Sequence, residues 1–148
     1  MAELEVLLER VCKELQTRFT TLMSGSHYLV GHDCHNWLTQ GRKEEIIKNG
    51  YWESYKASMS ERLDENTILK IDEDTDRILG YLADPANHQP QQRKGLVIGN
   101  VQSGKTSSYT GLICKAADAG YKIIIVIAGT ITTLRSQTQE RLERDFVG

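Results

Sequence analysis

The hydrophobic pattern of this chain changes part-way along its length. Up to about residue 85, apolar residues recur every three or four positions, which is the spacing of one face of an α-helix. From residue 95 onward, short continuous apolar runs alternate with stretches of helical spacing. Such runs are typical of parallel strands that are covered on both faces. The pattern therefore predicts a helical amino-terminal region followed by alternating strands and helices.

Two helices are expected in the first part of the amino-terminal region. Residues 2–23 place their leucines on one face and their charged residues on the other. We interpret this helix as packing on its own domain, with a seam for another helix or subunit as the alternative. A second helix opens near residue 51, where Trp52, Tyr55 and Met59 share one face. Aromatic residues at this spacing are typical of a protein core, so we predict that this face is buried.

A third helix and a linker complete this region. Asp72 or Asp74 is expected to cap the start of the helix. The helix is expected to end before Pro85, because the residue before a proline avoids helical geometry. The polar, proline-containing stretch that follows is predicted to be a linker. The predicted divisions are a helical region over residues 1–85, the linker over 86–94 and a second domain over 95–148.

The second domain reads as strand, helix, strand and helix. Gly120 is expected to stop the first of its helices. This order is the start of an open parallel sheet with helices on its faces, so we predict an α/β fold whose sheet is incomplete in this chain. The predicted strands cover residues 95–99 and 122–128, and the predicted helices cover residues 106–119 and 134–146.

A glycine-rich loop joins the first predicted strand to its helix. It matches the pattern Gly-x-x-x-x-Gly-Lys-Thr at every fixed position. In this pattern, backbone amides and the helix dipole hold phosphate, the lysine contacts the β and γ phosphates, and the threonine hydroxyl binds magnesium. We therefore predict a site for ATP and Mg²⁺, with Thr106 as the magnesium ligand. The expected ATP-binding residues are Gly99, Asn100, Val101, Gln102, Ser103, Gly104, Lys105, Thr106 and Ser107.

The residues after the second predicted strand carry donors that suit the phosphates of a nucleic acid. They are Thr130, Thr132, Arg135 and Gln137. An ordinary helix start with capping threonines explains the same residues, and the two interpretations stay open. The formal net charge of −2 lacks the basic balance of a self-sufficient nucleic-acid binder, although a local basic strip can act within a neutral chain.

The remaining composition indicates a cytoplasmic protein without a membrane segment. No apolar run approaches the roughly 18 residues that cross a bilayer, and the acidic amino terminus differs from a signal peptide. The three cysteines form no tight pairing, so we expect reduced thiols. The cluster of His27, His32, Cys34 and His35 fits no usual zinc spacing.

Three stretches resemble a known family. They are the loop Val101-Gln102-Ser103-Gly104-Lys105-Thr106, the segment from Thr110-Gly111-Leu112-Ile113 to Ala119-Gly120-Tyr121, and Leu134-Arg135-Ser136-Gln137-Thr138-Gln139. They are similar to the Z-one domain proteins, large bacterial proteins whose helicase-like ATPase core is related to superfamily two. Members are found near restriction-modification and phage-defence genes and are regarded as endonucleases. The resemblance covers the last third of the chain strongly and the middle third loosely.

The resemblance implies a RecA-like motor that binds ATP and Mg²⁺ and engages nucleic acid, with DNA as the expected partner. It carries over Gly99, Gly104, Lys105 and Thr106 as nucleotide ligands and places Gln137 in the loop after the second strand. Hydrolysis also needs an acidic residue on a later strand and an arginine from elsewhere. We find neither before Gly148, so we expect a fragment or truncated product that binds ATP without hydrolysing it.

Two other functions stay open. The same loop occurs in small-molecule kinases, although no arginine-rich lid segment is visible here. The chain also fits a non-catalytic module, in which the amino-terminal helices mediate assembly with a protein partner or a second copy and the loop is vestigial.

Overall fold

The described part of the molecule is helical. The computed structural model describes residues 27–32, 34–46, 50–98 and 104–147. The predicted helix over 2–23 and residues 99–103 of the phosphate loop lie outside these ranges. The regular elements are α2 (Gln40–Ile46), α3 (Tyr51–Ser60), α4 (Glu65–Tyr81), α5 (Lys105–Asp118), α6 (Thr132–Leu142) and the short π-helix η1 (Glu143–Val147).

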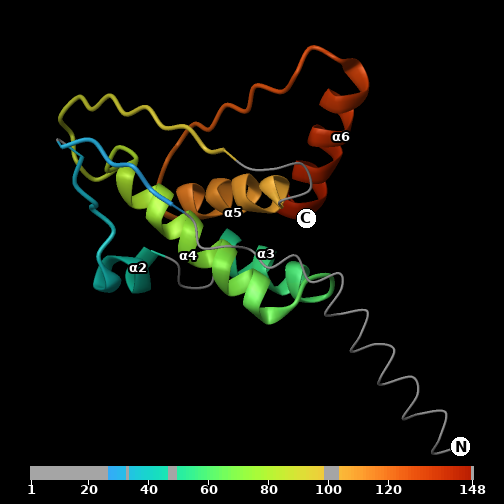
Figure 1. The fold of residues 1–148 in the computed structure, drawn as a ribbon, viewed down its shortest axis with the longest axis horizontal. Helices are drawn as coiled ribbons and strands as arrows, with labels where there is room; N and C mark the ends of the chain where they lie inside the picture. The colour runs from blue at the N-terminus through green and yellow to red at the C-terminus, as the bar shows by residue number, and fades with distance from the viewer. Residues whose placement is uncertain (1–26, 33, 47–49, 99–103, 148) are drawn as a thin grey trace, which may run out of the picture.

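The core lies where α5 packs across α3 and α4 (Figure 1). Trp52, Tyr55 and Met59 are buried on the inner side of α3, which confirms the predicted face. They meet Ile71 from α4 and Cys114 from α5 in a single hydrophobic cluster. Burial of large apolar and aromatic side chains supplies most of the stabilisation of a bundle this small.

A glycine sets how closely α5 approaches its neighbours. A Cβ atom on Gly111 would lie 2.9 Å from Cζ3 of Trp52 and 3.5 Å from Cγ2 of Thr75. Any larger residue would therefore push α5 away from α3 and α4. The indole of Trp52 fills the space that the absent side chain leaves.

The helix α4 begins earlier than the sequence predicted. Asp64 is its cap, because its carboxylate accepts a hydrogen bond from the backbone N–H of Thr67 at 3.0 Å. Asp72 and Asp74, the predicted caps, lie inside the helix, so that prediction was wrong. The helix ends at Tyr81, ahead of Pro85, as predicted.

The predicted α/β fold is wrong for the described residues, which contain helices and no strand. The described residues of the two predicted strands, 95–98 and 122–128, run as extended chain that forms no backbone ladder with another described segment (Figure 1). Several of their aliphatic side chains face solvent: Leu96 is 83%, Ile98 86% and Ile127 91% exposed. A strand exists only when a neighbour accepts its hydrogen bonds, and residues 95–98 and 122–128 have no such neighbour among the described residues. The strand propensity of these residues was therefore not sufficient to form strands.

The far end of α5 closes in a way that the sequence predicted. Gly120 adopts φ = 96°, a left-handed conformation that favours glycine. Its backbone N–H donates to the carbonyl of Ala117, and that of Tyr121 donates to the carbonyl of Ala116. These two bonds satisfy carbonyls at the helix end and form a Schellman motif.

The end of the described chain returns to the bundle. The predicted charged helix is present as α6, which stands at one end of α5, and η1 continues it toward α3 (Figure 1). Phe146 stacks on Tyr51, with ring centroids 4.8 Å apart. This contact brings the last described turn of the chain beside the start of α3.

Candidate functional site

The described part of the phosphate-binding motif forms the start of α5. Gly104 immediately precedes the helix and has φ = 75°, which a residue with a side chain rarely adopts. Lys105 is the first helical residue, and Thr106 and Ser107 complete the first turn. No side chain caps this helix start among the described residues. The fixed glycine, lysine and threonine of the motif therefore lie at the positive end of a helix dipole, as predicted.

Thr106 has a partner that the sequence did not predict. Nη1 of Arg141, on α6, donates a hydrogen bond to the hydroxyl oxygen of Thr106 at 3.0 Å. The two residues are 35 positions apart in the chain, and only the return of α6 toward α5 brings them together. The guanidinium group of Arg141 is exposed, whereas Thr106 is half-buried.

The neighbouring residue, Ser107, connects this end of α5 to the core. Its side chain lies beside the phenol of Tyr55 on α3. Burial raises the pKa of Tyr55, and the hydroxyl of Ser107 offsets part of that rise. The phenol therefore stays neutral next to the first turn of α5.

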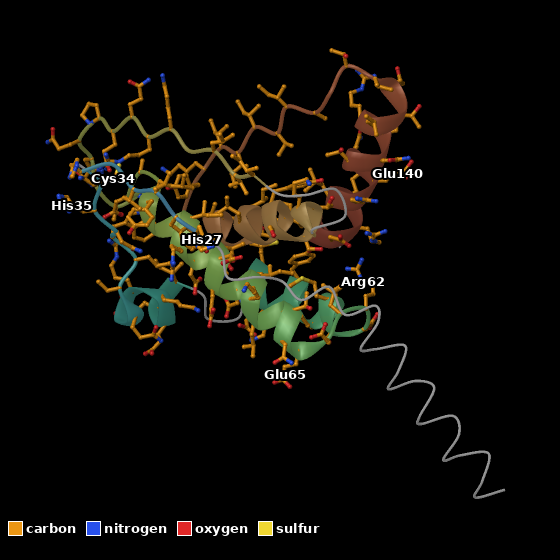
Figure 2. All side chains as sticks on the ribbon, in the orientation of Figure 1. His27, Cys34, His35, Arg62, Glu65 and Glu140 are labelled. Atoms are coloured by element: carbon orange, nitrogen blue, oxygen red, sulfur yellow. The ribbon has the colours of Figure 1, made fainter. Side chains whose placement is uncertain are left out.

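Basic residues gather at the same end of the bundle around one carboxylate. The side chain of Asp145 is 4% exposed and lies 2.8 Å from Nε of Arg144 and 3.5 Å from Nη2 of Arg62. The bond to Arg144 holds the pKa of Asp145 below its usual range, and the charges of Arg62 and Arg141 lower it further. Figure 2 shows Arg62 and α6, marked by Glu140, on the same side of the molecule. Three arginines against one carboxylate make this end of the molecule a surface suited to anions.

A buried ion network supports α5 from behind. Lys115 is fully buried, and its ammonium group donates to the carboxylates of Asp72 and Asp76 and, at 2.8 Å, to the backbone carbonyl of Asp72. Lys43, from α2, bonds the same two carboxylates. The Lys115 ammonium also lies 4.2 Å from the centre of the Trp52 ring. This network fixes the position of α5, and hence of its first turn, relative to α2, α3 and α4.

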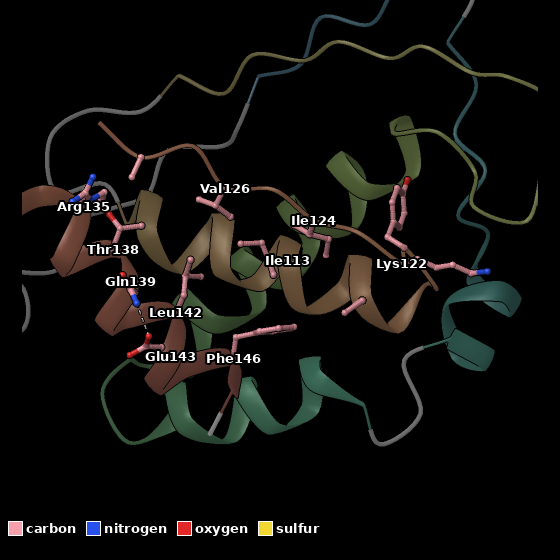
Figure 3. A pocket seen from close by; sticks show the side chains of 13 residues that line it. Ile113, Lys122, Ile124, Val126, Arg135, Thr138, Gln139, Leu142, Glu143 and Phe146 are labelled. Atoms are coloured by element: carbon pink, nitrogen blue, oxygen red, sulfur yellow. Dashed lines mark hydrogen bonds between the residues drawn. The ribbon is translucent and has the colours of Figure 1, made fainter. Parts of the chain in front are cut away.

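An apolar groove of about 510 Å³ lies between α5, the extended residues 121–128 and α6. Figure 3 shows Ile124 and Val126 directed toward Ile113 of α5. On the opposite wall, the amide of Gln139 donates to the carboxylate of Glu143 at 2.8 Å. The extended segment therefore presents two apolar faces, one toward this groove and one toward solvent.

The predicted nucleic-acid residues lie together around the start of α6. Thr130, Thr132, Arg135 and Gln137 are all exposed. The helix cap is Ile131, and no threonine side chain caps the helix. The capping interpretation of these threonines is therefore not supported, and their hydroxyls are accessible to a ligand. Arg135 also lines the apolar groove.

Magnesium is the metal that the motif implies. A threonine hydroxyl is the type of hard oxygen ligand that Mg²⁺ prefers, and Mg²⁺ usually takes only one or two protein ligands beside water and phosphate. Thr106 suits this role, since its oxygen retains a lone pair beside the bond from Arg141.

The histidine and cysteine residues near the start of the described chain do not converge. His27 lies apart from Cys34 and His35 (Figure 2). Within the described ranges no group of three or more histidine, cysteine, aspartate or glutamate residues could hold a metal ion. Cys34 and Cys114 are free thiols. Burial raises the pKa of Cys114 to about 12, so its thiol stays protonated and unreactive.

Comparisons with family models, with curated proteins and with solved structures find no match to this chain. Among the described helices, none has the length and apolar character required to cross a membrane.

Sequence reasoning missed Arg141 and Lys115. Arg141 belongs to no motif, and nothing in its spacing shows that it reaches α5. Lys115 had a signal, because it is a lysine amid the apolar residues of a predicted helix, while Asp72 and Asp76 share one face at a spacing of four. A charged residue on an apolar face needs a buried partner, and two carboxylates on another helix could supply one.

Proposed function

We propose that this chain binds ATP with Mg²⁺ through Gly99–Thr106 and Ser107, within a nucleic-acid-dependent, helicase-like ATPase of bacterial restriction or anti-phage defence. Its expected location is the cytoplasm. The observation that carries the proposal is the complete Gly-x-x-x-x-Gly-Lys-Thr motif, whose last three fixed residues form a left-handed glycine and the uncapped first turn of a 14-residue helix. Few local arrangements suit a polyphosphate as well as this one.

Each group has a separate role in the proposal. The amides at the start of α5 hold phosphate oxygens, and the ammonium group of Lys105 neutralises the β and γ phosphates. Thr106 contributes its hydroxyl to the magnesium ion. The buried network around Lys115 keeps the helix start in place, because α5 cannot shift without separating a fully buried ammonium group from its two carboxylates.

Nucleic acid enters the proposal through the start of α6. The exposed hydroxyl, amide and guanidinium groups of Thr130, Thr132, Arg135 and Gln137 suit contacts to a phosphate backbone, which need donors and no base recognition. The resemblance to the Z-one domain proteins supports DNA as the partner.

Nucleotide titration tests the central claim. Fluorescent ATP analogue is titrated in the presence of MgCl₂ into the chain, into Lys105→Ala and into the control Lys122→Ala. Lys122 is an exposed lysine beyond the opposite end of α5. Loss of a charge-assisted contact worth roughly 1.5–3 kcal/mol lowers affinity about ten- to a hundredfold in Lys105→Ala and leaves the control unchanged. Equal affinity for the ATP analogue in Lys105→Ala and Lys122→Ala contradicts the assignment of the ATP site.

Binding without hydrolysis is the second candidate function, and one observation favours it. Asp145, a carboxylate at this end of the bundle, is committed to Arg144 and Arg62. It is therefore poorly placed to orient a water molecule for attack. Phosphate release with and without DNA separates the candidates: stimulation by DNA supports the motor, stimulation by a small phosphate acceptor indicates a kinase, and binding with no turnover indicates the non-catalytic module.

A further inference from the structure

We infer that Arg141 is a ligand of the terminal phosphate and gives the site a preference for nucleoside triphosphate over diphosphate. The inference rests on the proposed function, because it concerns the same site. It adds a specificity-determining residue that lies outside the phosphate-binding motif and on a different helix.

The geometry places the guanidinium group beside the site and not at its periphery. Its Nη1 lies 3.0 Å from the hydroxyl oxygen of Thr106, which directly follows Lys105. A guanidinium group has five N–H donors, and the described structure engages one of them, with Thr106. The others belong to an exposed side chain and are accessible to a bound anion.

Within the described part of the chain, no carboxylate is hydrogen-bonded to Arg141. Asp145 is the carboxylate whose charge it feels, but the oxygens of Asp145 bond to Arg144 at 2.8 and 3.1 Å and to Arg62 at 3.5 Å. Asp145 therefore holds two other arginines. Arg141 remains the one of the three that points to the start of α5.

The proposed magnesium ligand explains why the phosphate in question is the terminal one. Thr106 would hold the magnesium ion, which would supply positive charge beside the terminal phosphates. The guanidinium group of Arg141 donates to the same Thr106 oxygen, so the two cations would repel each other unless an anion lay between them. The γ-phosphate would supply that negative charge. Arg141 would then exchange its bond to a neutral hydroxyl for a stronger bond to phosphate, for which the planar guanidinium group is well suited.

The test compares ATP and ADP, each with MgCl₂, on the chain, Arg141→Ala, Arg77→Ala and Lys105→Ala. Arg77 is the matched control: it is an exposed arginine on α4, and its guanidinium carbon lies 4.1 Å from the centre of the Tyr28 ring, outside the group of arginines around Asp145. We expect Arg141→Ala to lose about tenfold in ATP affinity and less than about twofold in ADP affinity. Arg77→Ala should retain both affinities within about twofold. Unfolding of each variant in urea shows that the fold is intact.

The outcomes separate this inference from the proposed function. Unchanged ATP affinity in Arg141→Ala, together with loss in Lys105→Ala, overturns the inference and leaves the proposed function standing. Equal losses for ATP and ADP also overturn it, because Arg141 would then act through Thr106 alone. Unchanged affinity in Lys105→Ala overturns the proposed function itself. Arg141→Lys adds a further arm: partial recovery of ATP affinity with no change for ADP supports a charge contact with the terminal phosphate.

Discussion

Replacement of the buried Lys115 by methionine tests how the bundle holds α5 in position. Methionine keeps most of the apolar length of lysine and its contact with Trp52, so the substitution removes the charge and little of the packing. It also leaves the carboxylates of Asp72 and Asp76 without their buried partner.

The structure sets the size of the expected loss. Removal of one partner from a buried ion pair costs about 3–5 kcal/mol, because a charge remains in a poorly solvated site. Here the cost is reduced, since the side chains of Asp72 and Asp76 are 16% and 19% exposed and Lys43 still contacts both. We therefore expect Lys115→Met to lower the free energy of unfolding by about 2–3 kcal/mol, a large share of the roughly 5–15 kcal/mol of a typical domain.

Urea unfolding followed by circular dichroism measures this loss. The midpoint should fall while the slope m stays constant, because the surface exposed on unfolding hardly changes. The control Lys122→Met, at an exposed lysine, should shift stability by less than about 0.5 kcal/mol. In the Lys115→Met background, Asp72→Asn with Asp76→Asn should recover at least about 1 kcal/mol, since the uncompensated charges are gone. A loss below about 1 kcal/mol, or no recovery in the triple variant, would refute the reasoning.

Two further predictions concern the same interface. Gly111→Ala places a methyl group against the Trp52 ring, so we expect a net loss of about 1 kcal/mol: overpacking costs about 1–3 kcal/mol and better helix propensity returns about 1. Gly41→Ala, in open space on α2, should instead gain a few tenths to about 1 kcal/mol, and equal shifts in the two variants would contradict the packing argument. Burial opposes ionisation of Asp72, but Lys115 and Lys43 outweigh it and hold its pKa below the usual value of about 3.9. Its stabilisation is therefore complete above about pH 4 and is lost as the pH falls through the folded pKa, so the free energy of unfolding measured from about pH 5 to 3 should fall more steeply in the native chain than in Lys115→Met.

Local signals in the sequence predicted local features of the structure. The spacing of Trp52, Tyr55 and Met59 identified a buried helix face, because a face recurs every 3.6 residues whatever it packs against. Gly120 identified the end of α5, because only glycine adopts its backbone conformation without strain. The aspartate caps were misplaced because several aspartates lie close together: Asp64 has extended backbone ahead of the helix and can cap it, whereas Asp72 and Asp74 lie inside the helix.

Features that depend on distant partners were not predictable in this way. The aliphatic residues 123–127 have high strand propensity, but a sheet requires a neighbouring strand, which propensity does not supply. Likewise, the bond from Arg141 to Thr106 depends on the path of α6 after the extended segment. The start of α5 was predictable from its motif, whereas the arginine beside it became visible only in three dimensions.

The cap of α3 has a consequence for the order in which the chain folds during synthesis. The carboxylate of Asp118, at the end of α5, accepts hydrogen bonds from the backbone N–H groups of Tyr51 and Trp52 at 2.8 and 2.9 Å. These partners are 67 and 66 positions apart. On the ribosome, α3 therefore emerges long before the residue that caps it. The earlier helices therefore lack this stabilising contact until the end of α5 has been synthesised. Native packing of the bundle forms late, because it depends on contacts between residues far apart in the sequence.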